Sequence, residues 1–245
     1  MYTDFASVYD SLMQDVDYEA WSNYYISIMD GINKNAKTIV ECACGTGNLS
    51  LYFAQRYELI ALDSSTQMLD IASRKAREQA LDIRFVKQKM QNLSLHKPVD
   101  FVLATCDGVN YITNKDDAIS FFKRAFNSLK AGGALIFDVS SKYKLSTILP
   151  SQLWFEDRED ISYFWINEYD KKENLLHLNL SIFVKQKLDL YKRIDEYQKQ
   201  KAFDIDEYKQ MLNVSGFSKV NIYGDKNFNY PKDNEERLHI IAIRE

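Results

Sequence analysis

Between residues 38 and 139 the chain alternates short β-rich runs with amphipathic helical stretches, and no other feature restricts its fold as strongly. The β-rich runs begin at Thr38, Leu59, Ile83, Val99 and Leu135. The stretch between the second and third runs repeats apolar residues at helical spacing from Met68 to Ala80. Strands that alternate with helices over short connections are typical of a parallel sheet covered by helices on both faces.

The rest of the chain predicts three additions to this unit. Residues 1–36 repeat apolar side chains at helical spacing and are expected to form a helical lid. Leucines alternate with polar residues over 175–184, which predicts an antiparallel sheet inserted over residues 150–203. The runs 217–223 and 237–243 would complete a mostly parallel sheet of seven strands. We therefore expect a doubly wound α/β core formed by residues 37–149 and 204–245.

Charge and composition exclude several classes of protein. The 245 residues carry a net charge of −4 without a long run of either sign, which is a poor match to nucleic-acid binding. No apolar stretch approaches the ~20 residues of a membrane span, and the first residues lack the pattern of a signal peptide. We expect a cytoplasmic protein whose cysteines, Cys42, Cys44 and Cys106, are free thiols. No His or acidic cluster has metal-ligand spacing, so no metal site is expected.

The strongest functional signal is a turn after the first β-rich run, with the sequence Glu41-Cys-Ala-Cys-Gly45-Thr-Gly47. Sheets of this kind bind ligands at the carboxyl ends of their strands. Small residues let a ligand approach the backbone, and the amides that start the next helix favour anionic groups. Asp63 ends the second run, where its carboxylate can accept hydrogen bonds from two ribose hydroxyls. The arrangement predicts a site for an adenosine-containing cofactor.

Two residues distinguish between such cofactors. A nicotinamide cofactor predicts the pattern G-x-G-x-x-G, but Ser50 stands at its third glycine position. Glu41 precedes the turn, where its charge would repel a pyrophosphate and attract the amino group of an amino-acid-like ligand. Both residues favour S-adenosylmethionine over a dinucleotide.

Taken together, four segments resemble the class I S-adenosylmethionine-dependent methyltransferases, whose core is Rossmann-like. These segments are 41–47, 62–69, 106–112 and 129–138. The opening residues resemble the lid of a small-molecule subgroup that is similar to sugar-amine N-methyltransferases and glycine N-methyltransferase. The resemblance covers nearly the whole chain and implies S-adenosylmethionine as methyl donor and S-adenosylhomocysteine as product. The implied cofactor-binding residues are Tyr9, Tyr18, Trp21, Glu41, Ala43, Cys44, Gly45, Thr46, Gly47, Asp63, Ser64, Met68, Lys89, Met90, Cys106 and Asp107.

Three positions depart from the family's pattern. Ala43 replaces the first glycine of the turn, which adds only a methyl group. Lys89 stands where relatives usually carry an acid that accepts from the adenine amino group, and lysine is only a donor. Gln198 stands where relatives often carry a histidine.

Methyl transfer to an amine requires a lid, aromatic walls and a proton acceptor. The candidate catalytic residues are Tyr9, Asp107, Tyr111, His177 and Glu196. The alternation places His177 opposite the leucines, where solvent exposure explains it equally well. We expect in-line transfer to a small molecule by a monomer or homodimer, with nitrogen favoured over oxygen by the subgroup resemblance alone. Two alternatives stay open: an RNA methyltransferase, and a non-catalytic protein that binds S-adenosylmethionine or a partner.

Overall fold

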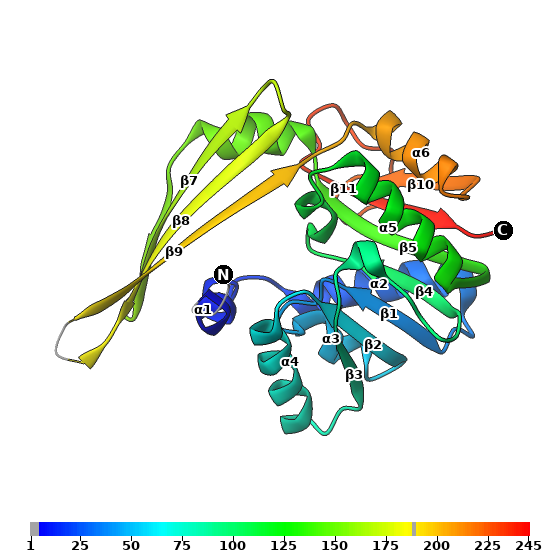
Figure 1. Cartoon of the computed structure of the whole chain (residues 1–245), viewed down its shortest axis with the longest axis horizontal. Coiled ribbons are helices and arrows are strands. Elements are labelled where there is room, and N and C mark those ends of the chain that lie inside the picture. Colours follow the sequence, from blue (N-terminus) through cyan, green and yellow to red (C-terminus); the bar gives the residue numbers. More distant parts are fainter. Residues whose placement is uncertain (1–4, 188–189) are drawn as a thin grey trace.

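The computed structural model describes residues 5–187 and 190–245. Its core is a seven-stranded sheet in the order β10-β11-β5-β4-β1-β2-β3, in which β11 runs antiparallel to both neighbours (Figure 1). The strands are β1 (Thr38–Cys42), β2 (Glu58–Asp63), β3 (Ile83–Lys87), β4 (Val99–Ala104), β5 (Leu129–Ser140), β10 (Lys219–Tyr223) and β11 (Arg237–Ile243). The predicted doubly wound, mostly parallel α/β sheet is confirmed.

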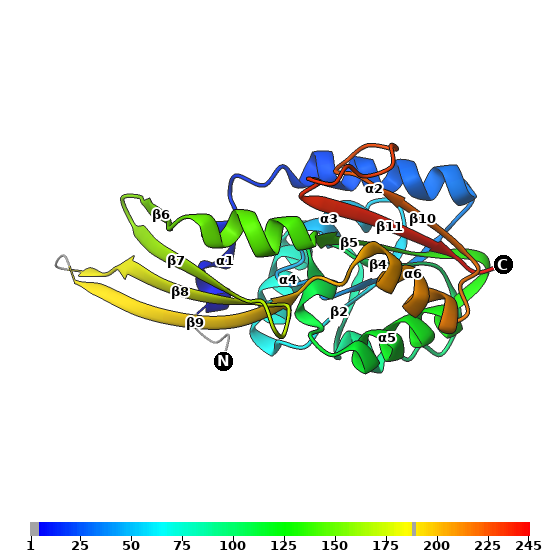
Figure 2. The ribbon, with the colours of Figure 1, turned by 90° about the horizontal axis from the view of Figure 1, so that it is seen from above.

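Helices cover both faces of the core sheet. They are α1 (Phe5–Leu12), α2 (Tyr18–Asn33), α3 (Asn48–Phe53), α4 (Thr66–Glu78), α5 (Lys115–Ser128) and α6 (Ile205–Val214), with the short turns η1 (Met90–Asn92), η2 (Gly108–Tyr111), η3 (Lys144–Ile148) and η4 (Leu149–Ser151). On one face α2 and α3 bury Tyr25 and Phe53. On the other face α5 and α6 bury Phe122 and Tyr208 (Figure 2).

Polar residues fix where several of these helices begin. Asp17 accepts a hydrogen bond from the backbone of Ala20, and Ser65 accepts one from Met68. Asn114 accepts two, from the first residues of α5. These side chains satisfy amides that have no partner within the first helical turn, which is why the sequence identifies the helix starts well.

One predicted turn lies inside a strand. The sequence predicts a turn at residues 131–134, but β5 runs continuously from Leu129 to Ser140. Gly132 has a left-handed φ of 76°, and a Cβ on Gly133 would lie 2.5 Å from the carbonyl oxygen of Asp100 in the neighbouring strand. The two glycines therefore accommodate an irregularity in the pairing of β4 with β5 instead of ending the strand.

A second, antiparallel sheet projects from the core, and we call it the roof (Figures 1 and 2). Its strands, in order, are β6 (Trp154–Asp157), β7 (Ile161–Asp170), β8 (Leu175–Lys185) and β9 (Tyr191–Lys201). The predicted antiparallel insertion is confirmed. The sequence did not reveal β6, because four residues are too few to display an alternating pattern.

The first helix joins the roof to the core. In Figure 1, α1 lies between α4 and the roof. Phe5 and Val8 of α1 share one apolar cluster with Met68 of α4 and with Ile182 and Ile194 of the roof. The helix α1 is thus placed to cover the space between the two sheets, as a lid would, whereas α2, also expected in the lid, packs on the core sheet.

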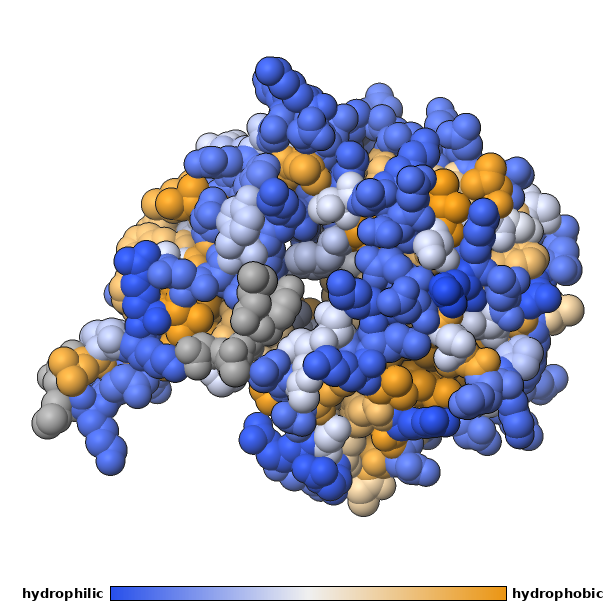
Figure 3. Space-filling model, in the orientation of Figure 1, coloured by the Kyte–Doolittle hydropathy of each residue, from blue (hydrophilic) through white to orange (hydrophobic). Residues whose placement is uncertain are grey.

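The surface in Figure 3 is mainly hydrophilic, with hydrophobic side chains in separate patches over the roof and the core, and with a hollow between these two parts. None of the described helices is long and apolar enough to cross a membrane.

Candidate active site

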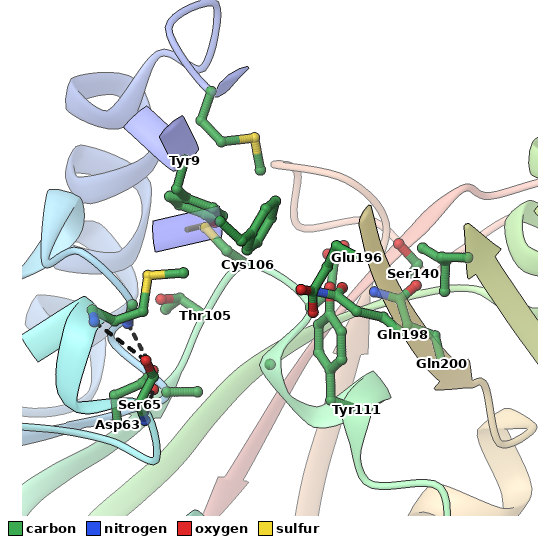
Figure 4. A pocket seen from close by; sticks show the side chains of 18 of the residues that line it. Tyr9, Asp63, Ser65, Thr105, Cys106, Tyr111, Ser140, Glu196, Gln198 and Gln200 are labelled. Atoms are coloured by element: carbon green, nitrogen blue, oxygen red, sulfur yellow. Dashed lines mark hydrogen bonds between the residues drawn. The ribbon is translucent and has the colours of Figure 1, made fainter. Parts of the chain in front are cut away.

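The carboxyl ends of β1, β2 and β4 meet at a cavity of about 830 Å³ that lies between the core sheet, α1 and the roof (Figure 4). In the turn after β1, Gly45 has a left-handed φ of 56°. Asp63 holds this turn: its Oδ2 accepts from the Gly45 backbone at 2.9 Å, and its Oδ1 accepts from the Ser65 backbone at 2.8 Å. Each carboxylate oxygen keeps a second lone pair, so Asp63 can also accept from a ligand in the cavity.

Glu41 lines the same cavity from the end of β1, with only 1% of its surface exposed. The hydroxyl of Ser50 donates to its carboxylate, and that of Thr105 does so at 3.5 Å. The pKa of Glu41 is raised to about 7, mainly by burial and to a smaller extent by the nearby charge of Asp63, while the two hydroxyls act in the opposite direction. A buried carboxyl with only hydroxyl partners among the described residues can receive a cationic group.

A carboxylate on α1 ties the lid to the cofactor turn. Asp10 accepts from the Thr46 hydroxyl at 2.6 Å and from the Asn48 amide at 3.0 Å, and it pairs with Lys75 of α4 at 2.9 Å. One turn of helix is therefore anchored at three points around the turn. Tyr9, its neighbour, lines the cavity, and burial raises the pKa of its phenol well above the usual value.

The loop after β4 is held by a buried ionic cluster. Cys106 and Asp107 both have left-handed backbones, with φ of 54° and 61°, and both donate their backbone N–H to the fully buried Asp138. Tyr25 donates its hydroxyl to Asp138 at 2.5 Å. Arg237 of β11 pairs with both Asp107 and Asp138. Burial alone would raise the pKa of Asp107, but the Arg237 guanidinium lowers it. The cluster fixes a strained loop at the cavity wall.

The roof contributes the opposite wall of the cavity. Its strand register places Trp154, Trp165, Leu180 and Glu196 in one cross-strand row, and all four line the cavity. Glu196 is 7% exposed, and burial raises the pKa of its carboxyl. In Figure 4, Glu196 and Tyr111 lie on the roof side, across the cavity from Asp63 and Ser65.

Most of the predicted site residues meet at this cavity. Those that line it are Tyr9, Tyr18, Glu41, Ala43, Cys44, Gly45, Thr46, Asp63, Ser64, Met68, Lys89, Met90, Cys106, Asp107, Tyr111 and Glu196. Most of them follow parallel strands of the core, as the rule for such sheets requires. Tyr9 and Tyr18 come from the N-terminal helices, and Glu196 comes from the antiparallel roof.

Three predicted residues do not line the cavity, which corrects their placement. Trp21 packs inside the core against Tyr25, with the Arg237 guanidinium 5.0 Å from its ring centre. Gly47 turns toward α4, where a Cβ would lie 2.9 Å from that of Ala72. His177 lies on the outer face of the roof, where its ring contacts the Tyr197 hydroxyl at 2.5 Å, because residues alternate along β8.

The sequence did not identify several other residues that line the cavity, nor two residues that hold its walls in place. Trp154 was missed because β6 was not recognised, and Trp165 and Gln200 lie on expected strands but carry no motif. Asp10 and Arg237 support the site by binding side chains of other elements that are distant in the sequence. Their role is therefore visible only in the folded structure. An arginine at the start of the otherwise apolar run 237–243 was the one available signal for Arg237.

Comparisons with known proteins agree with this geometry. Residues 39–133 match a family model described as a methyltransferase domain. The chain is 33% identical over 244 residues to the protein named "Putative methyltransferase YqeM" of Bacillus subtilis, and the match covers 99% of this chain and 96% of that protein.

Solved structures extend the likeness to the whole fold. An S-adenosylmethionine-dependent methyltransferase from Clostridium acetobutylicum has a TM-score of 0.89 at 31% identity, with 99% of this chain and 98% of the other covered. The sugar N-methyltransferase KedS8 from Streptoalloteichus has a TM-score of 0.80 at 16% identity, with 97% of this chain and 92% of the other covered, and it shares the fold. S-adenosylmethionine is the methyl donor of such proteins. The chain belongs to the class I S-adenosylmethionine-dependent methyltransferases.

Proposed function

We propose that the protein transfers a methyl group from S-adenosylmethionine to the nitrogen of a small-molecule amine. The observation that carries this proposal is the buried carboxylate of Glu196, which stands in one row with Trp154 and Trp165. A carboxylate beside aromatic faces favours a cationic ammonium group and disfavours an anionic or purely apolar acceptor. Fold neighbours that are named N-methyltransferases are consistent with this acceptor class.

The residues on the core side fit the methyl donor. Asp63 retains free lone pairs toward the cavity and would accept from the two ribose hydroxyls. Glu41 would pair with the amino group of the methionine part. The helix α1, anchored by Asp10, would cover the bound molecule and exclude water.

When bound, the donor supplies a methyl group on a sulfonium, and the amine lone pair forms the N–C bond as the C–S bond breaks and leaves its electrons on sulfur. The chain's own groups position the acceptor and remove its proton. Glu196 holds the incoming ammonium group and takes a proton from nitrogen, which its raised pKa assists. Trp154 and Trp165 hold the body of the acceptor against the roof.

The pH dependence of cofactor binding tests the role of Glu41. We expect the affinity for S-adenosylhomocysteine to rise as pH increases through about 7, because only the ionised carboxylate pairs with an ammonium group. The stability of the free protein should change in the opposite sense. The folded pKa exceeds the ordinary value of 4.5, so the folded state binds more protons than the unfolded state between these values. Stability therefore falls as pH rises across that window.

Calorimetric titrations across this pH range measure the affinity, and denaturant unfolding of the free protein measures the stability, each with Glu41→Gln as the comparison. The variant should bind weakly at every pH, and its free form should lose less stability than the wild type as pH rises from about 4.5 to about 7. A wild-type affinity that is flat across the range, or an equal slope in the variant, would remove Glu41 from the proposed role.

The acceptor class is tested by supplying S-adenosylmethionine with pairs of amines and the matching alcohols, and by measuring S-adenosylhomocysteine formation. We expect product with amines and none with alcohols. Glu196→Gln should lower kcat/KM about 100-fold, as expected when a proton acceptor is removed. The control is Glu168→Gln, which removes a charge from the exposed outer face of β7 and should leave the rate unchanged. Preferential turnover of alcohols, or equal rates in both variants, would refute the amine proposal.

An RNA acceptor has no comparable support. The Glu196 carboxylate in the cavity wall and the net charge of −4 both disfavour a polyanion. Family membership also favours an enzyme over the non-catalytic alternative.

A further inference from the structure

Beyond Glu196, the inner face of β9 carries two more polar side chains that enter the cavity, Gln198 and Gln200. Residues at every second position of a strand point to the same face, so the three side chains form a ladder along one strand. Glu196 and Gln200 are four residues apart, which separates their Cα atoms by roughly 13 Å. The acceptor side of the cavity is therefore long and polar along one edge.

Gln200 is the unusual member of this ladder. Only 4% of its surface is exposed, and its side-chain amide makes no hydrogen bond to any described residue. The amide atoms are not sealed from the cavity, so they are open to water there and can be reached by a ligand. In contrast, Gln198 donates to Glu196 at 3.4 Å. The Gln200 amide thus has both a donor and an acceptor available inside the cavity.

The surroundings of Gln200 are held in place by the core. Asn110 of η2 donates to the backbone oxygens of Ser140 at 3.1 Å and of Lys201 at 2.9 Å, which ties the end of β5 to the end of β9. Ser140, also at the cavity wall, accordingly lies near Gln200 (Figure 4). Ser140 and Gln200 present a neutral hydroxyl and a neutral amide at this end, where Lys144 and Glu236 also line the cavity, whereas the other end of the ladder presents the Glu196 carboxylate.

The wall between the two ends is apolar. Leu178 stands beside Gln198 in the strand register, and Leu180 stands beside Glu196. Trp165 follows on the next strand. A ligand that spans the ladder would pass along these side chains, so its middle should be an apolar or aromatic body.

We infer that the acceptor carries two separated polar groups: an amine that Glu196 receives, and a neutral hydroxyl or amide that Gln200 binds at the far end of an apolar body. Gln200 then determines specificity, because a ligand that displaces water from its amide must supply a hydrogen-bonding group in return. This inference rests on the proposed amine acceptor and adds the second group and the residue that recognises it.

The test uses defined probes on the protein saturated with S-adenosylhomocysteine. Tyramine carries an amine, an aromatic body and a neutral hydroxyl, 2-phenylethylamine lacks the hydroxyl, and 4-(2-aminoethyl)benzoic acid replaces it with a charge. Calorimetric titration should give an affinity for tyramine about 5-fold above that for 2-phenylethylamine, as one satisfied hydrogen bond provides. The carboxylate analogue should bind more weakly than tyramine.

Two variants separate recognition from a merely structural role. Gln200→Leu should bind tyramine and 2-phenylethylamine equally, because leucine cannot form a hydrogen bond to the hydroxyl, and it should remain folded with a cooperative thermal transition. The control is Asn179→Leu, the same change of side chain on the exposed outer face of β8, which should keep the preference.

The outcomes distinguish the two proposals. If none of the three amines binds, the amine acceptor itself is refuted. If the amines bind but show no preference for the hydroxyl, if the carboxylate analogue binds best, or if Gln200→Leu retains the preference, then only the role of Gln200 is refuted. Loss of the preference in Gln200→Leu, together with its retention in Asn179→Leu, supports the inference.

Discussion

Replacing Asp63 with alanine is expected to weaken the binding of S-adenosylhomocysteine at least about 100-fold, because two hydrogen bonds to a charged acceptor are lost together. The structure adds a second reason for the loss. The same carboxylate fixes the cofactor turn through the backbone amides of Gly45 and Ser65. Isothermal titration calorimetry measures the affinity, and circular dichroism checks that the variant is folded.

The control must lose two backbone hydrogen bonds without touching the cavity. Asn114→Ala does this, because its side chain accepts from the backbones of Asp116 at 2.8 Å and Asp117 at 3.4 Å at the start of α5. It should cost about 1 kcal/mol of stability and leave the affinity unchanged. An unchanged affinity in Asp63→Ala would remove the proposed ribose contact from this account.

Replacing Arg237 with alanine is expected to lower the free energy of unfolding by about 3–5 kcal/mol, because it leaves buried carboxylates without their cation. Asp138 is fully buried, and the side chain of Arg237 is 14% exposed. Asp107 would also lose its partner, so the left-handed loop at the cavity wall should relax and cofactor binding should weaken as well. Denaturant unfolding measures the first effect, and calorimetric titration measures the second.

Arg56→Ala provides the comparison for Arg237→Ala. Arg56 pairs with Asp30 at 2.5 Å, but its side chain is 41% exposed, so the loss should be below about 1 kcal/mol. Arg237→Lys should fall between the two, because a single ammonium cannot match the fork of a guanidinium that bridges two carboxylates. If Arg237→Ala unfolds at the same denaturant concentration as the wild type, the cluster does not support the loop.

Much of the fold was predictable because local patterns and tertiary structure agree in the core. The alternation between residues 38 and 139 identified five parallel strands, and Ser65 and Asn114 marked helix starts by their capping side chains. The segment 131–134 was misread because two glycines are as compatible with close strand packing as with a turn. Only the neighbouring strand decides between these two interpretations.

The cofactor side of the candidate site was predictable for a related reason. The ends of parallel strands converge on one edge, so residues such as Glu41 and Asp63 are brought together by the topology alone. The acceptor side depends on register between strands of the roof, which a single sequence does not encode in a readable form. Trp165 became visible as a neighbour of Glu196 only through that pairing. Gln200 lies on the same strand as Glu196, and the outward direction of His177 follows from the alternation that the sequence already displays.

A crystal structure of the protein with S-adenosylhomocysteine tests the central claim most directly. The account predicts that the ribose hydroxyls lie on Asp63, that the amino group lies beside Glu41, and that the sulfur faces Glu196 across the cavity. A cofactor whose ribose lies away from Asp63, or whose sulfur faces away from the roof, would contradict it.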